Sequence, residues 1–141
     1  MNIMKIAGLL LVMSLPLVVG TVGSGEVVVD DSLAMDSIEE IVTVTTYHAV
    51  PGQTDSTPFI TASGYKINQR NPEDDKIIAI SRDLKDRFKF GDSVLISNTG
   101  KYDGVYYVHD VMNKRFRKKI DILINSKDSG DKFYNVLITK L

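Results

Sequence analysis

The sequence predicts a small all-β protein, a closed barrel of six or seven short strands with one or two short helices. Three observations lead to this prediction. Runs of β-branched and apolar residues recur at intervals of about 10 to 15 residues along the chain. Clusters of Gly, Pro, Asn, Asp and Ser separate these runs. The spacing leaves room for at most two short helices, which favours a barrel over a sheet of βαβ units.

The expected strands are apolar or alternating runs bounded by turn formers. The run 41–47 alternates β-branched residues with other residues, and it is the clearest of the strands. The run 76–81 is apolar enough to be buried on both faces. A brief extended segment is expected at 59–65. The other strands are expected at 93–97, 106–110, 120–124 and 134–141.

Helical structure is expected only in short pieces. The segment 83–88 fits one or two helical turns, because Ser81 or Asp83 can cap it and Gly91 stops it soon afterwards. The polar segment 126–133 fits a short helix or a loop. Neither piece is long enough to change the prediction of a barrel.

The N-terminus has the pattern of a secretory signal peptide. Lys5 precedes an almost entirely apolar stretch, 6–20, and small residues follow it. The apolar stretch is too short for a comfortable membrane span, although an uncleaved N-terminal anchor is the alternative. The expected organisation is a signal peptide at 1–24, a linker at 25–40 and the barrel domain at 41–141.

Export places the protein in the periplasm, the cell envelope or the extracellular space, with no stable membrane span after processing. Without residues 1–24 the chain keeps 16 basic and 18 acidic residues, a net charge of −2. This charge gives no overall electrostatic argument for binding nucleic acid. The chain has no cysteine, which excludes disulfides, thiolate metal sites and a thiol nucleophile, and its two histidines are far apart in the sequence. Neither a cofactor nor a metal is expected.

Asp110 and Asp121 are the candidate catalytic residues. Asp121 interrupts the apolar run 120–124, where a carboxylate must be paired, protonated or used. If the strands that carry the two aspartates are neighbours, both carboxyl groups can point toward one mouth of the barrel. Two carboxylates in one groove separate their pKa values, and burial raises one further, which provides a general acid at neutral pH. The alternative is a structural role, in which the carboxylates accept backbone hydrogen bonds at strand ends.

The loop before the segment 59–65 contains a further candidate, Asp55. Its neighbours are turn formers, and ordinary turn chemistry is sufficient to explain an aspartate there. If this loop forms one wall of a cleft, Asp55 binds substrate together with the hydroxyl groups of Thr61 and Ser63.

His109 and the basic cluster 114–119 have simpler interpretations. His109 precedes Asp110, so strict alternation in a strand places it on the opposite face, either packed or at the surface. The basic cluster suggests nucleic-acid binding, but a solvated face is favoured in an acidic, exported protein, and no nucleic acid is expected. Such a cluster can also attract an anionic polymer of the envelope or lower the pKa of a neighbouring aspartate.

Five motifs occur in an order that resembles a known family. The motifs are Thr-Ala-Ser-Gly at 61–64, Ile-Ala-Ile-Ser at 78–81, Phe-Gly-Asp-Ser-Val at 90–94, Tyr-Tyr-Val-His-Asp at 106–110 and Ile-Asp-Ile at 120–122. Their order resembles the 3D (three-aspartate) domain of the RlpA-like superfamily, a double-psi β-barrel shared by membrane-bound lytic transglycosylase A and stationary-phase muralytic proteins. The resemblance covers about Val44 to Leu141.

The resemblance implies cleavage of the glycan strand of peptidoglycan. By this analogy Asp121 is the general acid and then the general base. It protonates the glycosidic oxygen and then helps the 6-hydroxyl group of the sugar to attack, which leaves a 1,6-anhydro end. Asp110 is its supporting partner, and Asp55 and Thr61 line the groove.

The sequence departs from the family pattern in two places. The third family aspartate normally follows the Ile-Ala-Val strand, but Ser81 occupies that position here and Asp83 comes two residues later. The family usually places Thr-Gly-Gly after the aspartate that corresponds to Asp110. Here 111–113 is Val-Met-Asn, which indicates a different loop path.

Three functions are therefore open. The first is a lytic transglycosylase, and the second is a non-catalytic wall-binding or wall-loosening module, as in the similar barwin and expansin-like barrels. The third is a glycosidase with two carboxylates, whose separation suits either a nucleophile or a water. The larger transglycosylases of this type carry a second domain, so a partner protein that completes the groove is a further expectation.

Overall fold

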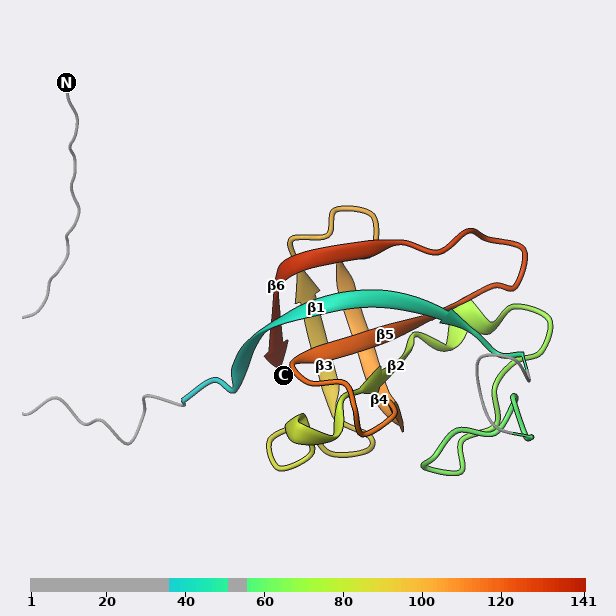
Figure 1. Ribbon diagram of the computed structural model, residues 1–141, viewed down its shortest axis with the longest axis horizontal. Helices are drawn as coiled ribbons and strands as arrows, with labels where there is room; N and C mark the ends of the chain where they lie inside the picture. The colour runs from blue at the N-terminus through green and yellow to red at the C-terminus, as the bar shows by residue number, and fades with distance from the viewer. Residues whose placement is uncertain (1–35, 51–55) are drawn as a thin grey trace, which may run out of the picture. The chain divides into compact units, whose positions relative to one another are not determined.

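Six strands form a closed barrel in the computed structural model, which describes residues 36–50 and 56–141. The helical pieces in these residues are two short 3-10 helices, η4 (Pro72–Asp75) and η5 (Arg82–Leu84). The predicted small all-β barrel with one or two short helices is therefore confirmed, with six strands (Figure 1). The strands are β1 (Glu39–His48), β2 (Ile77–Ile80), β3 (Ser93–Ser97), β4 (Gly104–Val111), β5 (Lys119–Ile124) and β6 (Lys132–Lys140).

The order of the strands around the barrel is β1-β5-β2-β4-β3-β6, and β6 closes the barrel against β1. The pairs β1–β5 and β2–β4 are parallel, and the other four pairs are antiparallel. Parallel neighbours need crossover connections, so sequence order and spatial order differ. β4 and β5 follow each other in the chain, yet β2 lies between them. The segment that joins them crosses the end of β2, where the Met112 N–H donates to the carbonyl oxygen of Ile80 (2.9 Å).

Several boundaries differ from those expected. β1 begins at Glu39, inside the predicted linker 25–40, and the rest of that linker lies mostly outside the described residues, as does the predicted signal peptide. The segment 59–65 contributes only an isolated bridge between Ile60 and Lys66. The segment 126–133 is a loop that runs into β6, which begins at Lys132.

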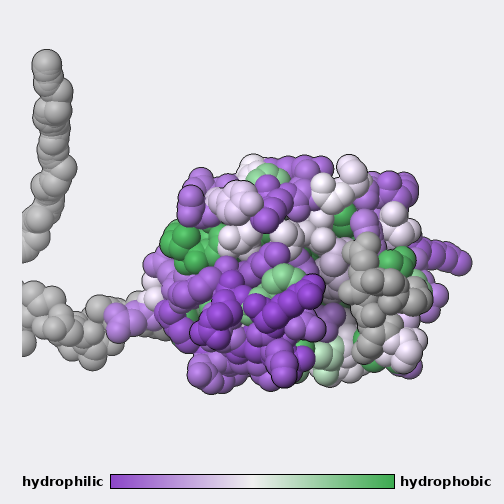
Figure 2. Space-filling model, viewed as in Figure 1, coloured by the Kyte–Doolittle hydropathy of each residue, from purple (hydrophilic) through white to green (hydrophobic). Residues whose placement is uncertain are grey.

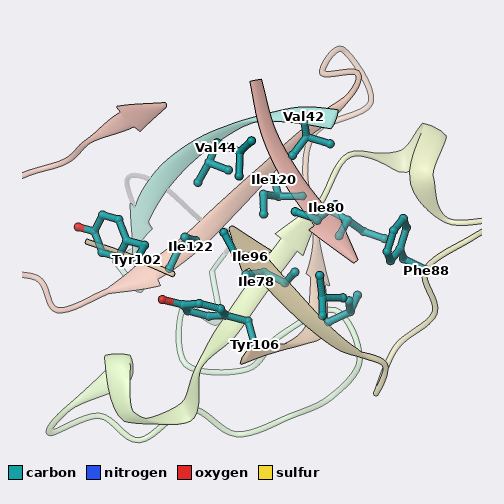
Figure 3. Packing of buried hydrophobic residues seen from close by; sticks show 14 of the residues in the cluster. Val42, Val44, Ile78, Ile80, Phe88, Ile96, Tyr102, Tyr106, Ile120 and Ile122 are labelled. Carbon is teal, nitrogen blue, oxygen red and sulfur yellow. The ribbon is translucent and has the colours of Figure 1, made fainter. Parts of the chain in front are cut away.

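Alternate residues of the strands fill the barrel with a closely packed apolar cluster (Figure 3). In β5 these inward side chains are Ile120, Ile122 and Ile124, each no more than 1% exposed. Phe88, after η5, lies at one end of the drawn cluster and Tyr102 at the other. The sequence alternation of β5 thus has a direct cause, because its even-numbered positions make up the interior.

A second apolar cluster lies outside the barrel wall. It joins outward residues of β1, β2 and β5 to the segments 59–67 and 112–116. All four residues of β2 are buried, because Ile78 and Ile80 face the interior while Ile77 and Ala79 face the outer cluster. The predicted burial of this strand on both faces is confirmed.

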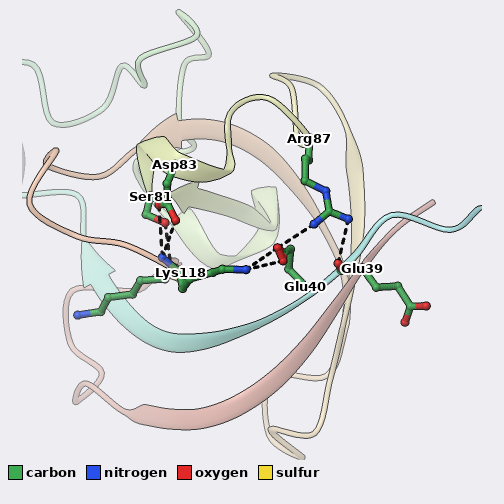
Figure 4. Close-up of polar contacts among 7 residues, drawn as sticks. Glu39, Glu40, Ser81, Asp83, Arg87 and Lys118 are labelled. Carbon is green, nitrogen blue, oxygen red and sulfur yellow. Dashed lines mark hydrogen bonds and ion pairs between the residues drawn. The ribbon is translucent and has the colours of Figure 1, made fainter.

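A network of charged side chains ties β1 to η5 and to the segment between β4 and β5 (Figure 4). Glu40 pairs with Arg87 Nη1 at 2.8 Å and with Lys118 Nζ at 2.6 Å. Its own carboxylate is only 10% exposed, whereas the two cations are about half exposed. The backbone N–H of Lys118 donates to the Asp83 carboxylate at 3.0 Å. Lys118 therefore connects three parts of the chain.

Replacement of Glu40 by Gln is expected to lower the free energy of unfolding by roughly 1 kcal/mol, about 4–8 °C in Tm. The hydrogen bond from Lys118 and the charges of Lys118 and Arg87 hold the pKa of Glu40 below its usual value, so this stabilisation is present at neutral pH and is lost as the pH falls through that pKa. Thermal denaturation at neutral and acidic pH measures the effect. Glu39→Gln is the matched control, because Glu39 is exposed on the same strand. An equal loss in both variants contradicts the prediction.

The face drawn in Figure 2 is mostly hydrophilic, with apolar residues in separate patches. The exposed large apolar side chains are spread over several elements; Ile41 on β1, Val105 on β4 and Tyr134 on β6 are examples. Singly exposed apolar residues are ordinary on soluble domains. The surface of this face therefore does not identify a site, and the site is located from the two aspartates.

Candidate active site

Asp110 and Asp121 lie on either side of Ala79. Ala79 of β2 pairs with Asp110 of β4 in the parallel ladder and with Asp121 of β5 in the antiparallel ladder. Ala79 is 4% exposed and presents only a methyl group between the two acidic residues. The structure therefore brings the two sequence-predicted catalytic residues together across one strand.

Both carboxyl groups belong to the outer face of the barrel wall. In β5, Ile120 and Ile122 point into the inner cluster, so Asp121 between them points outward. Ala79, opposite Asp121, belongs to the outer cluster. The expectation that neighbouring strands carry the pair toward one mouth is wrong, because β2 separates the two strands and the pair lies across its outer side.

A β-bulge in β4 places His109 and Asp110 against the same loop. The ladder between β2 and β4 skips His109, immediately before Asp110. His109 Nδ1 lies 3.0 Å from the hydroxyl oxygen of Ser63, and the N–H of Ala62 donates to Asp110 Oδ1 at 3.1 Å. Strict alternation predicted opposite faces for the two side chains, and the extra residue of the bulge is the reason this is wrong.

Among the residues that the structure describes, the donors to the Asp110 carboxylate include two backbone N–H groups and one hydroxyl group. The N–H groups of Ala62 and Val111 donate to Oδ1 at 3.1 and 3.0 Å, and the hydroxyl group of Tyr47 donates to Oδ2 at 3.1 Å. Such donors stabilise the ionised form of a carboxylate and fix its orientation. These hydrogen bonds therefore favour the charged form of Asp110 and hold its carboxylate in one orientation.

The surroundings of Asp121 differ from those of Asp110. Its neighbours Ile120 and Ile122 on β5 face the interior, and the hydroxyl group of Thr45 on β1 donates to its Oδ1. Burial raises the pKa of Asp121 to about 6, with the charge of Lys119 opposing the rise and that of Asp110 adding to it. A carboxyl group of this pKa can hold a proton near neutral pH and release it to a leaving group.

Thr61 and Ser63 shape the loop that contacts Asp110. Thr61 is 5% exposed, its hydroxyl oxygen accepts the N–H of Tyr65 at 3.1 Å, and it lies 3.0 Å from the hydroxyl oxygen of Ser63. Gly64 has a φ of 88°, which favours glycine, and its N–H donates to the carbonyl oxygen of Thr61 at 2.9 Å. These bonds hold the N–H of Ala62 toward Asp110. A substrate-binding role for Thr61 and Ser63 stays a prediction.

His109 is a packed side chain. Its ring stacks on Tyr65 with ring centroids 4.6 Å apart, and burial lowers the pKa of the imidazole while Asp75 acts in the opposite direction. The neutral ring therefore braces the loop beside Asp110.

A groove of about 560 Å³ lies over Asp110 and Asp121, which is within the usual size range of small-molecule sites. Arg82, Arg115 and Phe116 also line it. The guanidinium group of Arg115 lies 4.8 Å from the centroid of the Phe116 ring. Part of the basic cluster 114–119 thus lines the candidate site, and the groove contains both acidic and basic side chains.

Ser81 and Asp83, named from the family pattern, are not among the described residues that line the groove. Asp55 is outside the described residues. Ser81 is completely buried, and its hydroxyl oxygen accepts the N–H of Lys119 at 3.0 Å. Burial opposes ionisation of Asp83, but hydrogen bonds from Ser81 and from the backbone of Lys118 outweigh it and hold the pKa of Asp83 below its usual value. Ser81 and Asp83 therefore fasten the start of β5.

Sequence reasoning missed the residues that surround the two carboxyl groups. Thr45 and Tyr47 lie in a predicted strand, and nothing local in the sequence shows that this strand runs parallel to β5. The parallel register sets Thr45 opposite Asp121. Tyr47 follows two residues later on the same face and reaches Asp110.

No group of three or more His, Cys, Asp or Glu that could hold a metal ion occurs within residues 36–50 and 56–141. In the same part of the chain, no helix has the length and apolar character needed to cross a membrane. Comparison of the chain with protein-family models and with curated proteins found no match.

Proposed function

We propose that this protein is an exported, peptidoglycan-active lytic transglycosylase with the double-psi barrel of the 3D domain family. The observation that carries the proposal is Asp121, an outward-facing carboxyl group whose pKa burial raises to about 6, set beside the oriented carboxylate of Asp110. One carboxyl group that holds a proton and one that stays charged are what acid-catalysed cleavage of a glycosidic bond needs.

The reaction proposed for Asp121 has two proton transfers. Asp121 donates its proton to the glycosidic oxygen while the bond from that oxygen to the anomeric carbon breaks. The 6-hydroxyl oxygen of the same sugar then bonds to the anomeric carbon and its proton passes to Asp121, which restores the acid and leaves a 1,6-anhydro end. The negative charge of Asp110 stabilises the positive charge that develops on the sugar ring.

The topology supports the family assignment at a coarse level. A closed barrel of six strands with two parallel pairs is compatible with a double-psi barrel. The aspartates of the two motifs also meet across one strand, as a shared catalytic role requires. The export signal is supported by the pattern of residues 1–24.

A non-catalytic polysaccharide-binding module is the second candidate, and one feature favours it. Where the family usually has Thr-Gly-Gly, β4 continues through Val111 and Met112 packs into the outer cluster. The groove therefore has a different wall from a typical member, and a partner protein that completes it is compatible with either candidate.

Digestion of purified sacculi, followed by mass spectrometry of the soluble products, tests the proposal. Fragments with 1,6-anhydro ends are the expected result. New reducing ends would instead indicate a hydrolytic glycosidase with two carboxylates. Binding to sacculi without new ends would contradict an enzymatic function for the chain acting alone and favour the binding module.

A further inference from the structure

We propose that Tyr47 is a positioning residue that directs the proton of the carboxyl pair to Asp121 by binding Asp110. The effect on catalysis rests on the proposed function, but the effect on proton placement does not. Tyr47 is not part of the motifs that resemble the 3D domain. It lines the groove from β1, which is neither of the strands that carry the two aspartates.

The geometry gives Tyr47 a distinct oxygen of Asp110. Oδ1 receives the backbone N–H groups of Ala62 and Val111, whereas Oδ2 receives the phenolic hydroxyl group at 3.1 Å. A proton added to Asp110 at Oδ2 would meet the hydroxyl hydrogen of Tyr47, and the hydroxyl would have to turn away. Tyr47 thereby disfavours protonation of Asp110 at Oδ2, while the two backbone N–H groups bind Oδ1.

Tyr47 is suited to act as a permanent donor. Its side chain is 7% exposed and packs in the outer cluster with Ala79, so the position of the ring is set by its neighbours. Burial, followed by the charge of Asp110, raises the pKa of Tyr47 above its usual value. The hydroxyl group consequently keeps its hydrogen throughout the range in which carboxyl groups titrate.

β1 therefore contacts both members of the pair in different ways. Thr45 binds Asp121 and Tyr47 binds Asp110, two residues apart on the same face. Both hydroxyl groups are donors to carboxylates here, but burial raises the pKa of Asp121, which is the better place for the proton. β1 therefore gives each of the two aspartates a different hydrogen-bond donor.

Other charged or titratable groups also lie near the pair. They remain in a Tyr47→Phe variant, so the variant isolates the hydroxyl group. Among the described residues these groups include Lys119 on β5, whose charge opposes protonation of Asp121, and Arg82 on η5 and Arg115 in the β4–β5 connection, which line the groove. The titratable but neutral ring of His109 lies in the bulge of β4.

The test is carboxyl-carbon NMR of the full exported chain through the acidic range, with Tyr47→Phe and the matched control Tyr106→Phe. Tyr106 is also buried, 4% exposed, but belongs to the cluster inside the barrel. In the parent and in the control, the chemical shift of the Asp121 carboxyl carbon is expected to change near pH 6, and that of Asp110 is expected to stay constant there. In Tyr47→Phe, the carboxyl carbons of Asp110 and Asp121 are expected to shift together in that step, because the two groups then share one proton. A step confined to Asp121 in the variant overturns the proposal.

A second arm separates positioning from a loss of folding. Tyr47→Phe is expected to reduce kcat on glycan by about two- to ten-fold with little change in KM, because part of the enzyme then carries its proton on Asp110. When Asp110 is replaced by Asn, the additional substitution Tyr47→Phe is expected to have no further effect on the titration of the Asp121 carboxyl carbon. If Tyr47→Phe has the same effect with Asp110 present and with Asn at that position, Tyr47 acts through packing, and the proposal is overturned.

If the parent does not cleave glycan, the proposed function fails while the titrations still decide the role of Tyr47.

Discussion

Asp121→Asn is expected to reduce cleavage of glycan strands by about 10²- to 10⁴-fold while leaving the barrel folded. Asparagine has the shape of aspartate and its carbonyl oxygen can accept the hydrogen bond from Thr45, but it cannot donate a proton to a leaving group. Release of soluble fragments from purified sacculi measures the effect, and circular dichroism checks the fold.

A matched control is available on the surface. Asp86→Asn makes the same chemical change at an exposed position after η5, and its activity is expected to equal that of the parent. The assignment of Asp121 as acid and base is contradicted if Asp121→Asn remains fully active. Loss of activity in both variants would point instead to a general effect of charge.

The same Asp121→Asn substitution is expected to stabilise the protein at neutral pH by roughly 2–3 kcal/mol. The pKa of Asp121 is about 6 in the folded chain, above the value of about 3.9 for an unfolded aspartate. Between these values the folded state binds more protons than the unfolded state, so stability falls as the pH rises from about 4 to about 6 and stays lower above that. Asparagine removes this loss because it does not ionise.

Urea denaturation at neutral pH and near pH 4 measures this difference. The stabilisation is expected at neutral pH and should vanish near pH 4, where the parent already holds its proton. A gain of the same size at both values would show that the carboxyl group is not destabilised by burial, and the raised pKa would lose its support.

The two predictions for Asp121 together describe a compromise between the stability of the fold and catalytic activity. A carboxyl group set among apolar side chains weakens the fold at neutral pH, and the same desolvation makes it an acid of useful strength. The isosteric change is expected to improve stability and remove activity together. A purely structural aspartate would show the reverse, because its replacement would break hydrogen bonds without any gain.

The sequence by itself determined the all-β class, the position of most strands and the burial of β2 on both faces. These features depend on local patterns, since alternation and turn formers act within a few residues. It also singled out Asp121, because an acid in an apolar strand is unusual wherever that strand is placed.

The tertiary structure alone decided which strands are neighbours and therefore what surrounds the two aspartates. The parallel pairing of β2 with β4 and of β1 with β5 joins residues distant in the sequence, and no local pattern encodes that register. The bulge at His109 turned Asp110 toward the loop at Ala62, which strict alternation could not predict. Tyr47 came to the site for the same reason, because a side chain's partner across a barrel is set by strand order and register.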